Sequence, residues 1–201
     1  GGGVAGRVVS RSAGCGVPPG RFVRVEDKVS GVGERGHGWR ERRGETRVIG
    51  LTGAAGKTTV KELLAQVLSR RGLTAKTHMN LNYQIGLPLS MLAATGEEAF
   101  WGMEAGISHP NDMDELGAIL EPDLALILNV GPGHAAGLGD RGTAHYTSKL
   151  LAPLPPGGTA IHSAAYPDLA RAARALPHEL ALFSPPGPPG DSPTDHVLPH
   201  G

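Results

Sequence analysis

The sequence predicts an α/β fold, a parallel sheet with crossover helices. From about residue 47, short apolar runs alternate with segments of helical periodicity, which is typical of parallel strands joined by helices. The run "DLALILNV" at 123–130 is apolar almost throughout, as expected for a strand covered on both faces. A glycine-containing turn at 52–59 lies between the first strand and the first helix of this region.

The expected elements follow one another regularly along the chain. Residues 47–51 ("RVIGL") predict a buried strand. The helix after it has one apolar face at helical spacing, made of Val60, Leu63, Leu64, Val67 and Leu68. Further strands are expected at 74–78, 100–105, 123–130, 159–163 and 180–184, and further helices at 112–120, 142–152 and 167–176.

The two ends of the chain differ from this central region because they carry much of its glycine and proline. The N-terminal part predicts the tail of a smaller α/β domain and a linker, with strands at 6–11 and 21–27 and a connecting helix at 33–44 weakened by its glycines. The chain is therefore divided into three parts: 1–46, the central domain at 47–184, and an irregular tail at 185–201.

Composition excludes several classes of protein. Lysine plus arginine and aspartate plus glutamate number 19 each, so no bulk charge indicates nucleic acid or an anionic membrane. The cluster Arg40, Arg42, Arg43 and Arg47 has no interleaved aromatic residue beyond Trp39, and we interpret it as a solvated linker face. The single cysteine, Cys15, excludes an internal disulfide framework. With no membrane-length apolar run and no leader, we expect a soluble, cytoplasmic protein.

The turn after the first strand predicts a phosphate-binding loop, Thr52-Gly53-Ala54-Ala55-Gly56-Lys57-Thr58-Thr59. Glycines let the backbone curl so that several N–H groups point inward, and the helix N-terminus adds partial positive charge. Lys57 supplies a full charge, and the Thr58 hydroxyl is placed to hold Mg²⁺. The segment departs from the strict P-loop pattern, because Leu51 occupies the position of its leading glycine. The alternative is an ordinary strand-to-helix turn with an exposed lysine.

Two side chains at predicted strand ends are candidates for the metal site. Glu104 ends the strand at 100–105, at the carboxyl edge where open α/β sheets bind ligands, and a carboxylate is a ligand that Mg²⁺ accepts. His134 lies in the loop "NVGPGHAAGLGD" after the strongest strand. The alternatives are a carboxylate that reaches solvent and a solvated loop histidine.

The segment "NLNYQIGLPLS" at 80–90 offers Asn80 and Asn82 as amide donors or acceptors for a substrate. A capped turn before a helix would explain the same residues.

Four segments in this order resemble the Mur ligases: "TGAAGKTTVKE", "NLNYQIGLPL", "MEAGISHPNDM" and "LNVGPGHAAGLGD". The resemblance implies an enzyme, an ATP-dependent amide ligase that adds D-Ala-D-Ala to UDP-MurNAc-tripeptide through an acyl phosphate in peptidoglycan synthesis. It also implies ATP and Mg²⁺ as cofactors, and we expect a monomer with small-molecule substrates. Residues 21–50 would then be the end of a UMP-moiety-binding domain and its linker, and 47–184 part of the central ATPase domain.

The resemblance also implies a role for each candidate residue. Lys57 would contact the β- and γ-phosphates, Thr58 and Glu104 would hold a first Mg²⁺, and His134 would assist at a second. Asn80 and Asn82 would lie near the muramoyl-peptide substrate. Lys57, His134 and Lys149 are the candidate catalytic residues.

Three positions depart from the family pattern. Tyr83 replaces an expected asparagine, and Met79 an expected glycine. The family carries a carbamylated lysine on the helix after the histidine loop, and an ungapped alignment puts Thr147 in its place, with Lys149 two residues later. Two residues correspond to about 200° around a helix. Either Lys149 substitutes after a local rearrangement, or the handling of Mg²⁺ and acyl phosphate is impaired.

Three functions stay open at this point. The first is a Mur-type ligase represented by an incomplete chain, an expectation supported by the initial Gly1 and by the absence of counterparts to further domains. The second is a nucleotide-binding remnant without ligase activity. The third is another P-loop enzyme, such as a small kinase or a ligase resembling folylpolyglutamate synthase.

Overall fold

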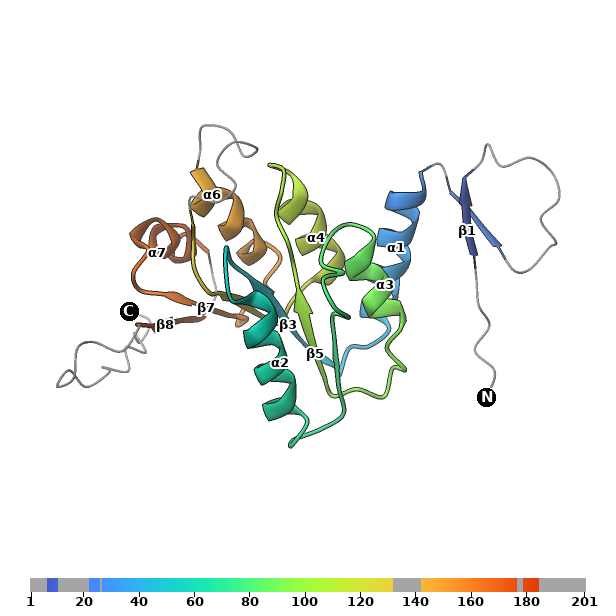
Figure 1. Ribbon diagram of the computed structural model, residues 1–201, viewed down its shortest axis with the longest axis horizontal. Helices are drawn as coiled ribbons and strands as arrows, with labels where there is room; N and C mark the ends of the chain where they lie inside the picture. Colours follow the sequence, from blue (N-terminus) through green and yellow to red (C-terminus); the bar gives the residue numbers. More distant parts are fainter. Residues whose placement is uncertain (1–6, 11–21, 26, 132–141, 177–178, 185–201) are drawn as a thin grey trace.

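The central element is a six-stranded sheet, all of whose strands run parallel (Figure 1). The computed structural model describes residues 7–10, 22–25, 27–131, 142–176 and 179–184. The strand order is β4-β5-β3-β6-β7-β8. Their bounds are Thr74–Lys76 (β4), Phe100–Glu104 (β5), Arg47–Thr52 (β3), Leu124–Ile127 (β6), Thr159–Ser163 (β7) and Glu179–Phe183 (β8). The predicted α/β fold is thus confirmed.

Helices connect these strands and form a layer on each face of the sheet. They are α2 (Lys57–Leu68), α3 (Gly86–Leu92), α4 (Asp112–Leu120), α6 (Gly142–Ser148), the 3-10 helix η1 (Lys149–Leu151) and α7 (Pro167–Arg174). One face of the sheet contributes Trp101, Met103 and Ala125 to a core that also holds Met91 of α3 and Leu116 of α4. The other face is covered by α2, which packs on β3, β4 and β5.

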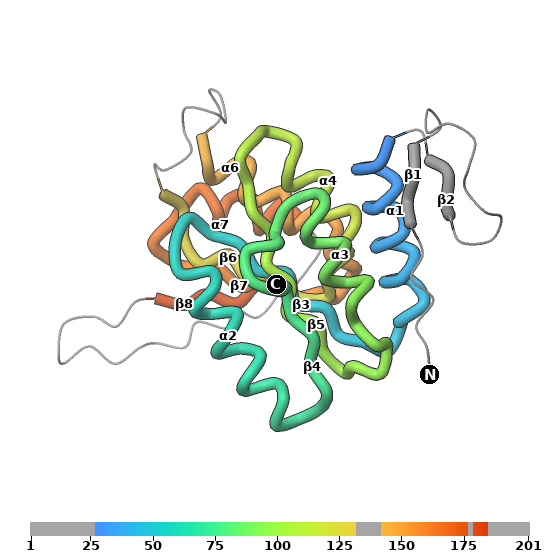
Figure 2. Tube along the Cα trace, turned by 45° about the vertical axis from the view of Figure 1, so that its right-hand side comes forward, coloured from blue at the N-terminus to red at the C-terminus, as the bar shows by residue number. Residues whose placement is uncertain are grey.

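The helix α1 (Lys28–Glu41) precedes the sheet and begins five residues earlier than the predicted start at 33. Asp27 caps it, because its carboxylate accepts from the Ser30 N–H at 2.8 Å. The glycines that weaken this helix have a packing reason: a Cβ on Gly36 would lie 2.6 Å from Cβ of Pro88 in α3. Because these glycines have no side chains, α1 can lie close beside α3 (Figures 1 and 2).

Strands β1 (Arg7–Ser10) and β2 (Phe22–Val25) pair in parallel as a separate two-stranded sheet (Figure 1). They coincide with the strands predicted at 6–11 and 21–27. That residues 1–46 belong to a separate domain stays a prediction, as does the irregular tail at 185–201.

The apolar face expected on α2 is only partly covered by the sheet. Leu63 and Val67 are 56% and 64% exposed, whereas the buried residues of this helix are Lys61 and Ala65. Leu64 and Leu68 do turn toward the sheet, where they line an open groove of about 580 Å³ together with Leu124, Leu126 and Ile161. The apolar pattern of the helix is therefore shared between the sheet and solvent.

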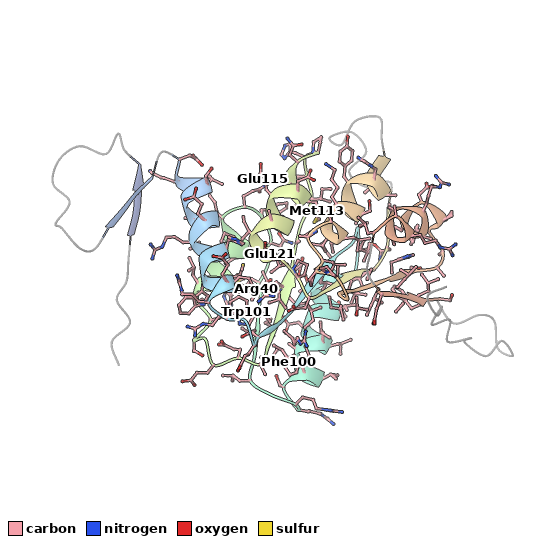
Figure 3. The ribbon with its side chains drawn as sticks, turned by 180° about the vertical axis from the view of Figure 1, so that it is seen from behind. Arg40, Phe100, Trp101, Met113, Glu115 and Glu121 are labelled. Atoms are coloured by element: carbon pink, nitrogen blue, oxygen red, sulfur yellow. The ribbon has the colours of Figure 1, made fainter. Side chains whose placement is uncertain are left out.

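The arginine cluster is only in part the solvated face that we expected, because Arg42 and Arg47 are exposed whereas Arg40 and Arg43 are half-buried. Arg40 donates to the carbonyl oxygen of Glu121 at 3.2 Å and to the carboxylate of Asp123 at 3.1 Å (Figure 3). The guanidinium carbon of Arg43 lies 4.1 Å from the centre of the Trp39 ring, a cation–π contact. The contacts of Arg40 tie α1 to the segment between α4 and β6.

Within the residues that the model describes, no helix is both long and apolar enough to cross a membrane.

Candidate nucleotide-binding site

The phosphate-binding loop joins β3 to α2 at the carboxyl edge of the sheet. Two glycines have positive φ angles, 152° at Gly53 and 80° at Gly56, where a residue with a side chain would be strained. Gly56 is the N-cap of α2, so the helix begins at Lys57. The N–H groups of the first helical turn have no partner inside the helix, and the helix dipole adds positive potential there. The turn is therefore built to bind an anion.

Asn129, two residues after β6, shapes this loop. Its Oδ1 accepts from the N–H groups of Ala54 and Ala55, each at 2.9 Å, and its Nδ2 donates to the carbonyl of Ala55, also at 2.9 Å. Since β6 is the neighbour of β3 in the sheet, its carboxyl end lies beside the loop. Asn129 thereby fixes the first half of the loop, and the N–H groups that begin α2 are left for a ligand.

Two predicted residues of the loop meet the partners that phosphate and metal binding need. The Lys57 ammonium donates to the Gly53 carbonyl at 2.7 Å, which holds it across the loop. The Thr58 hydroxyl lies 3.4 Å from Oε2 of Glu104 at the end of β5. A hydroxyl and a carboxylate oxygen from two elements thus meet beside the phosphate-binding turn. Oxygen donors of this kind fit Mg²⁺, which uses one or two protein ligands beside phosphate oxygens and water.

The Glu104 side chain is only 2% exposed and has several polar partners at the site. Its Oε1 accepts from Nδ2 of Asn82 at 2.7 Å, and its Oε2 lies 3.4 Å from the ammonium of Lys61. Its backbone N–H donates to the Thr77 hydroxyl at 2.7 Å. The carboxylate therefore does not simply reach solvent, which was the alternative interpretation from sequence.

These groups surround one cavity of about 450 Å³. Its lining residues come from the loop, from the start of α2, from the segment before α3 and from the end of β5; they are Ala54, Ala55, Gly56, Lys57, Thr58, Thr59, Asn80, Asn82, Tyr83 and Glu104. Of the predicted loop residues, Thr52 is buried at the end of β3 and outside this lining, as is Gly53. The structure thus brings together the predicted phosphate, magnesium and substrate residues, whose binding roles stay predictions.

Lys149 is not part of this group. It begins η1, its ammonium pairs with the carboxylate of Asp114 in α4, and it lies 5.7 Å from the centre of the Tyr146 ring. Thr147 is buried, 2% exposed, at the end of α6. The catalytic role predicted for Lys149 is thus without support from this geometry. His134, the other predicted metal ligand and catalytic residue, lies outside the described residues.

The structure shows the surroundings of Met79 and Tyr83, the two residues of the asparagine segment that depart from the family pattern. Met79 has a φ angle of 48°, the left-handed conformation that favours glycine, which explains why the family pattern expects glycine there. Tyr83, in place of the expected asparagine, lines the cavity, and its hydroxyl lies 3.2 Å from that of Ser108. Among the residues described, no group of three or more His, Cys, Asp or Glu side chains forms a metal cluster.

Sequence reasoning missed two residues of the site, Asn129 and Lys61. Asn129 is the first polar residue after the most apolar strand, and that position at the carboxyl edge is the signal that could have identified it. Lys61 follows Lys57 by one helical turn, so it faces the same side. Nothing else in the sequence distinguishes this lysine from a solvated one, because buried lysines are rare.

The fold and this site together define an α/β domain of the P-loop type. The family model described as the Mur ligase middle domain matches residues 51–186. The chain therefore belongs to the Mur ligase family.

Several relatives support the same conclusion. The UDP-N-acetylmuramoyl-tripeptide--D-alanyl-D-alanine ligase of Escherichia coli K12 is 34% identical over 164 residues, which is 81% of this chain and 35% of that protein. A crystal structure of MurF from Acinetobacter baumannii has a TM-score of 0.75 at 33% identity, covering 81% of this chain and 36% of that one. The structure of MurF ligase from Thermotoga maritima in complex with ADP has a TM-score of 0.76 at 26% identity, covering 90% and 41%.

The chain spans about a third of the length of the curated relatives it matches: 35%, 30% and 31% of three of them.

Proposed function

We propose that the chain provides the ATP- and Mg²⁺-binding part of a ligase that joins D-Ala-D-Ala to UDP-MurNAc-tripeptide in peptidoglycan synthesis. The observation that carries the proposal is the meeting of Lys57, Thr58 and Glu104 with Asn80 and Asn82 around one cavity. Phosphate-binding and amide-bearing residues share this space, as an enzyme needs when it transfers a phosphoryl group to a bound substrate. The MurF relatives, named for this ligation or solved with ADP, support the assignment.

Each residue has a role that follows from its chemistry. The N–H groups at the start of α2 bind phosphate oxygens, and the Lys57 ammonium exchanges the Gly53 carbonyl for the β- and γ-phosphates. Thr58 and Glu104 would hold Mg²⁺, which when bound would supply positive charge beside the transferred phosphoryl group. Asn80 and Asn82, which line the same cavity, orient the peptide-bearing substrate. Catalysis then rests on position and electrostatics.

The reaction proceeds in two steps in this proposal. An oxygen of the terminal carboxylate attacks the γ-phosphorus of ATP, so that ADP leaves and an acyl phosphate forms. The amine nitrogen of D-Ala-D-Ala then attacks the acyl carbon, inorganic phosphate leaves, the nitrogen loses a proton, and an amide bond results.

A second candidate function is nucleotide binding without ligation. It is favoured by Thr147, buried in the position where the family carries its carbamylated lysine, and by the engagement of Lys149 with Asp114. The two candidates share the nucleotide site and differ in turnover.

The experiment measures ATP binding by calorimetry with Mg²⁺, and then ADP release with and without UDP-MurNAc-tripeptide and D-Ala-D-Ala. Release stimulated by both substrates supports ligation by this chain. Tight ATP binding without stimulation supports the second candidate, and absence of ATP binding contradicts both.

Lys57→Ala is the matched variant for the phosphate site. Its ammonium contacts the Gly53 carbonyl, which reaches water once the side chain is gone, so the fold should stay intact. We expect at least about a hundredfold weaker ATP binding, the equivalent of ~3 kcal/mol, because a charge-assisted contact to two phosphates is lost. Unchanged affinity would reject the proposed phosphate site.

A further inference from the structure

Lys61 is a fully buried lysine beside Glu104 of the candidate site. Its side chain is 0% exposed, and its ammonium lies 3.4 Å from Oε2 of Glu104 and donates to the Met79 carbonyl at 2.7 Å. Lysine is almost never buried without a partner, so the pair with Glu104 is the reason that this position holds a cation. One ammonium therefore contacts both the candidate metal ligand and the segment that leads to Asn80 and Asn82.

The position of Lys61 has an electrostatic consequence for Glu104. The same oxygen, Oε2, faces the Lys61 ammonium and the Thr58 hydroxyl, and it is the oxygen available to a metal held jointly with Thr58. A divalent cation at Oε2 is repelled by the ammonium a few ångströms away, in surroundings that water does not screen well. Nucleotide phosphates supply the negative charge that offsets this repulsion.

From this geometry we infer that Lys61 is a positioning residue, the resident counter-ion of Glu104, which makes divalent metal enter the site with nucleotide instead of ahead of it. Through the Met79 carbonyl it also holds the segment bearing Asn80 and Asn82 in register with the phosphate-binding helix. The inference rests on the proposed function, because it takes Thr58 and Glu104 as the metal ligands.

The decisive variant is Lys61→Met, which keeps the length of the side chain and removes the charge. Mn²⁺ is the probe, and its binding is followed by electron paramagnetic resonance at pH 8 in the absence of nucleotide. We expect Lys61→Met to bind Mn²⁺ at least about tenfold more tightly than the wild-type chain, because the competing cation is gone. A folded variant with unchanged or weaker Mn²⁺ binding would overturn the inference.

Two controls make the result specific. Lys76→Met also removes one cation, from an exposed pair with Glu62, and it should leave Mn²⁺ binding unchanged. Glu104→Gln in the Lys61→Met background should abolish the gained Mn²⁺ binding. If it does not, the metal binds elsewhere and the inference fails.

The inference stays testable even if Lys61→Met does not fold. In that case the unpaired carboxylate is the expected cause, so the double variant Lys61→Met/Glu104→Gln should recover a thermal midpoint near that of the wild type. A double variant as unstable as the single one would assign Lys61 to packing alone and overturn the counter-ion role. Failure of the wild-type chain to bind MgATP is a separate result, which contradicts the proposed function.

Discussion

Asn129 and Ala55 hold each other by two hydrogen bonds: Oδ1 of Asn129 accepts from the Ala55 N–H, and Nδ2 donates to the Ala55 carbonyl, both at 2.9 Å. The same Oδ1 accepts from the Ala54 N–H at 2.9 Å. An amide side chain is the simplest group that can satisfy the backbone donor and the backbone acceptor of one residue at once. The end of β6 thereby sets the conformation of the phosphate-binding loop on β3.

Replacing Asn129 should therefore weaken ATP binding. Asn129→Ala removes the acceptor of the Ala55 N–H and leaves the Ala54 N–H only the backbone carbonyl of residue 129, at 3.3 Å. The loop is then held less firmly, and we expect a loss of about 1–3 kcal/mol in binding free energy. Asn129→Asp keeps the acceptor, removes the donor to Ala55 and adds a negative charge beside the phosphates. It should bind ATP more weakly than Asn129→Ala when titrated by calorimetry at low salt. Wild-type affinity in the aspartate variant would contradict this role.

The elements of the sheet could be predicted because their patterns are local. The helix at 112–120 and the strand at 159–163 were predicted with the bounds that the structure has. The apolar run at 123–130 is longer than β6, which ends at Ile127, because Asn129 turns toward the phosphate-binding loop. An apolar run indicates that residues are buried, but it does not show at which residue the strand stops pairing with its neighbours.

The contacts that complete the site could not be predicted from local pattern. The pair of Lys61 and Glu104 joins residues 43 positions apart in sequence, through the packing of α2 on β5. Helical periodicity identified an apolar stripe on α2, but exposure depends on which elements lie against the helix. Leu63 faces solvent for that reason. Lys61 is buried, although the pattern predicts a polar, solvent-facing residue at its position.

Met79→Gly should stabilise the chain. Met79 has a φ angle of 48° and is 71% exposed, so its side chain adds strain and little packing. Glycine removes the penalty of about 1–2 kcal/mol for the left-handed conformation. Glycine also makes the unfolded chain more flexible, which offsets part of this gain, so the free energy of unfolding should rise by about 0.5–1 kcal/mol in total. Urea denaturation measures the change. Met79→Ala is the control, because it keeps Cβ and should show no such gain; equal gains in both variants would refute the strain argument.

Lys149→Ala tests the role of this lysine. Its pair with Asp114 is partly exposed, at 27% and 48%, so its loss should lower the free energy of unfolding by no more than about 1 kcal/mol. The ammonium lies outside the cavity lining, and ATP affinity should stay unchanged. Calorimetry and urea denaturation measure the two quantities. Loss of ADP release in this variant, under conditions where the wild-type chain turns over, would instead support the catalytic role predicted from sequence.

His162 should make the stability of the chain depend on pH. It is fully buried on β7, its Nδ1 lies 3.0 Å from the Ser163 carbonyl, and its Nε2 has no hydrogen-bond partner among the described residues. Burial lowers the pKa of this imidazole below its ordinary value of 6.5, and the positive charge of Arg174 lowers it further. As the pH falls below 6.5, the imidazole of His162 binds a proton in the unfolded chain before it does so in the folded chain. The contribution of His162 to the free energy of unfolding is therefore complete above pH 6.5 and is lost progressively below it. The slope of the free energy of unfolding against pH should approach about 1.4 kcal/mol per pH unit for one proton.

Urea denaturation between pH 5 and 8 measures this slope. His162→Leu should reduce the slope, whereas His109→Gln, at a side chain 78% exposed, should not. Equal slopes in the wild type and His162→Leu would show that the acid sensitivity arises elsewhere.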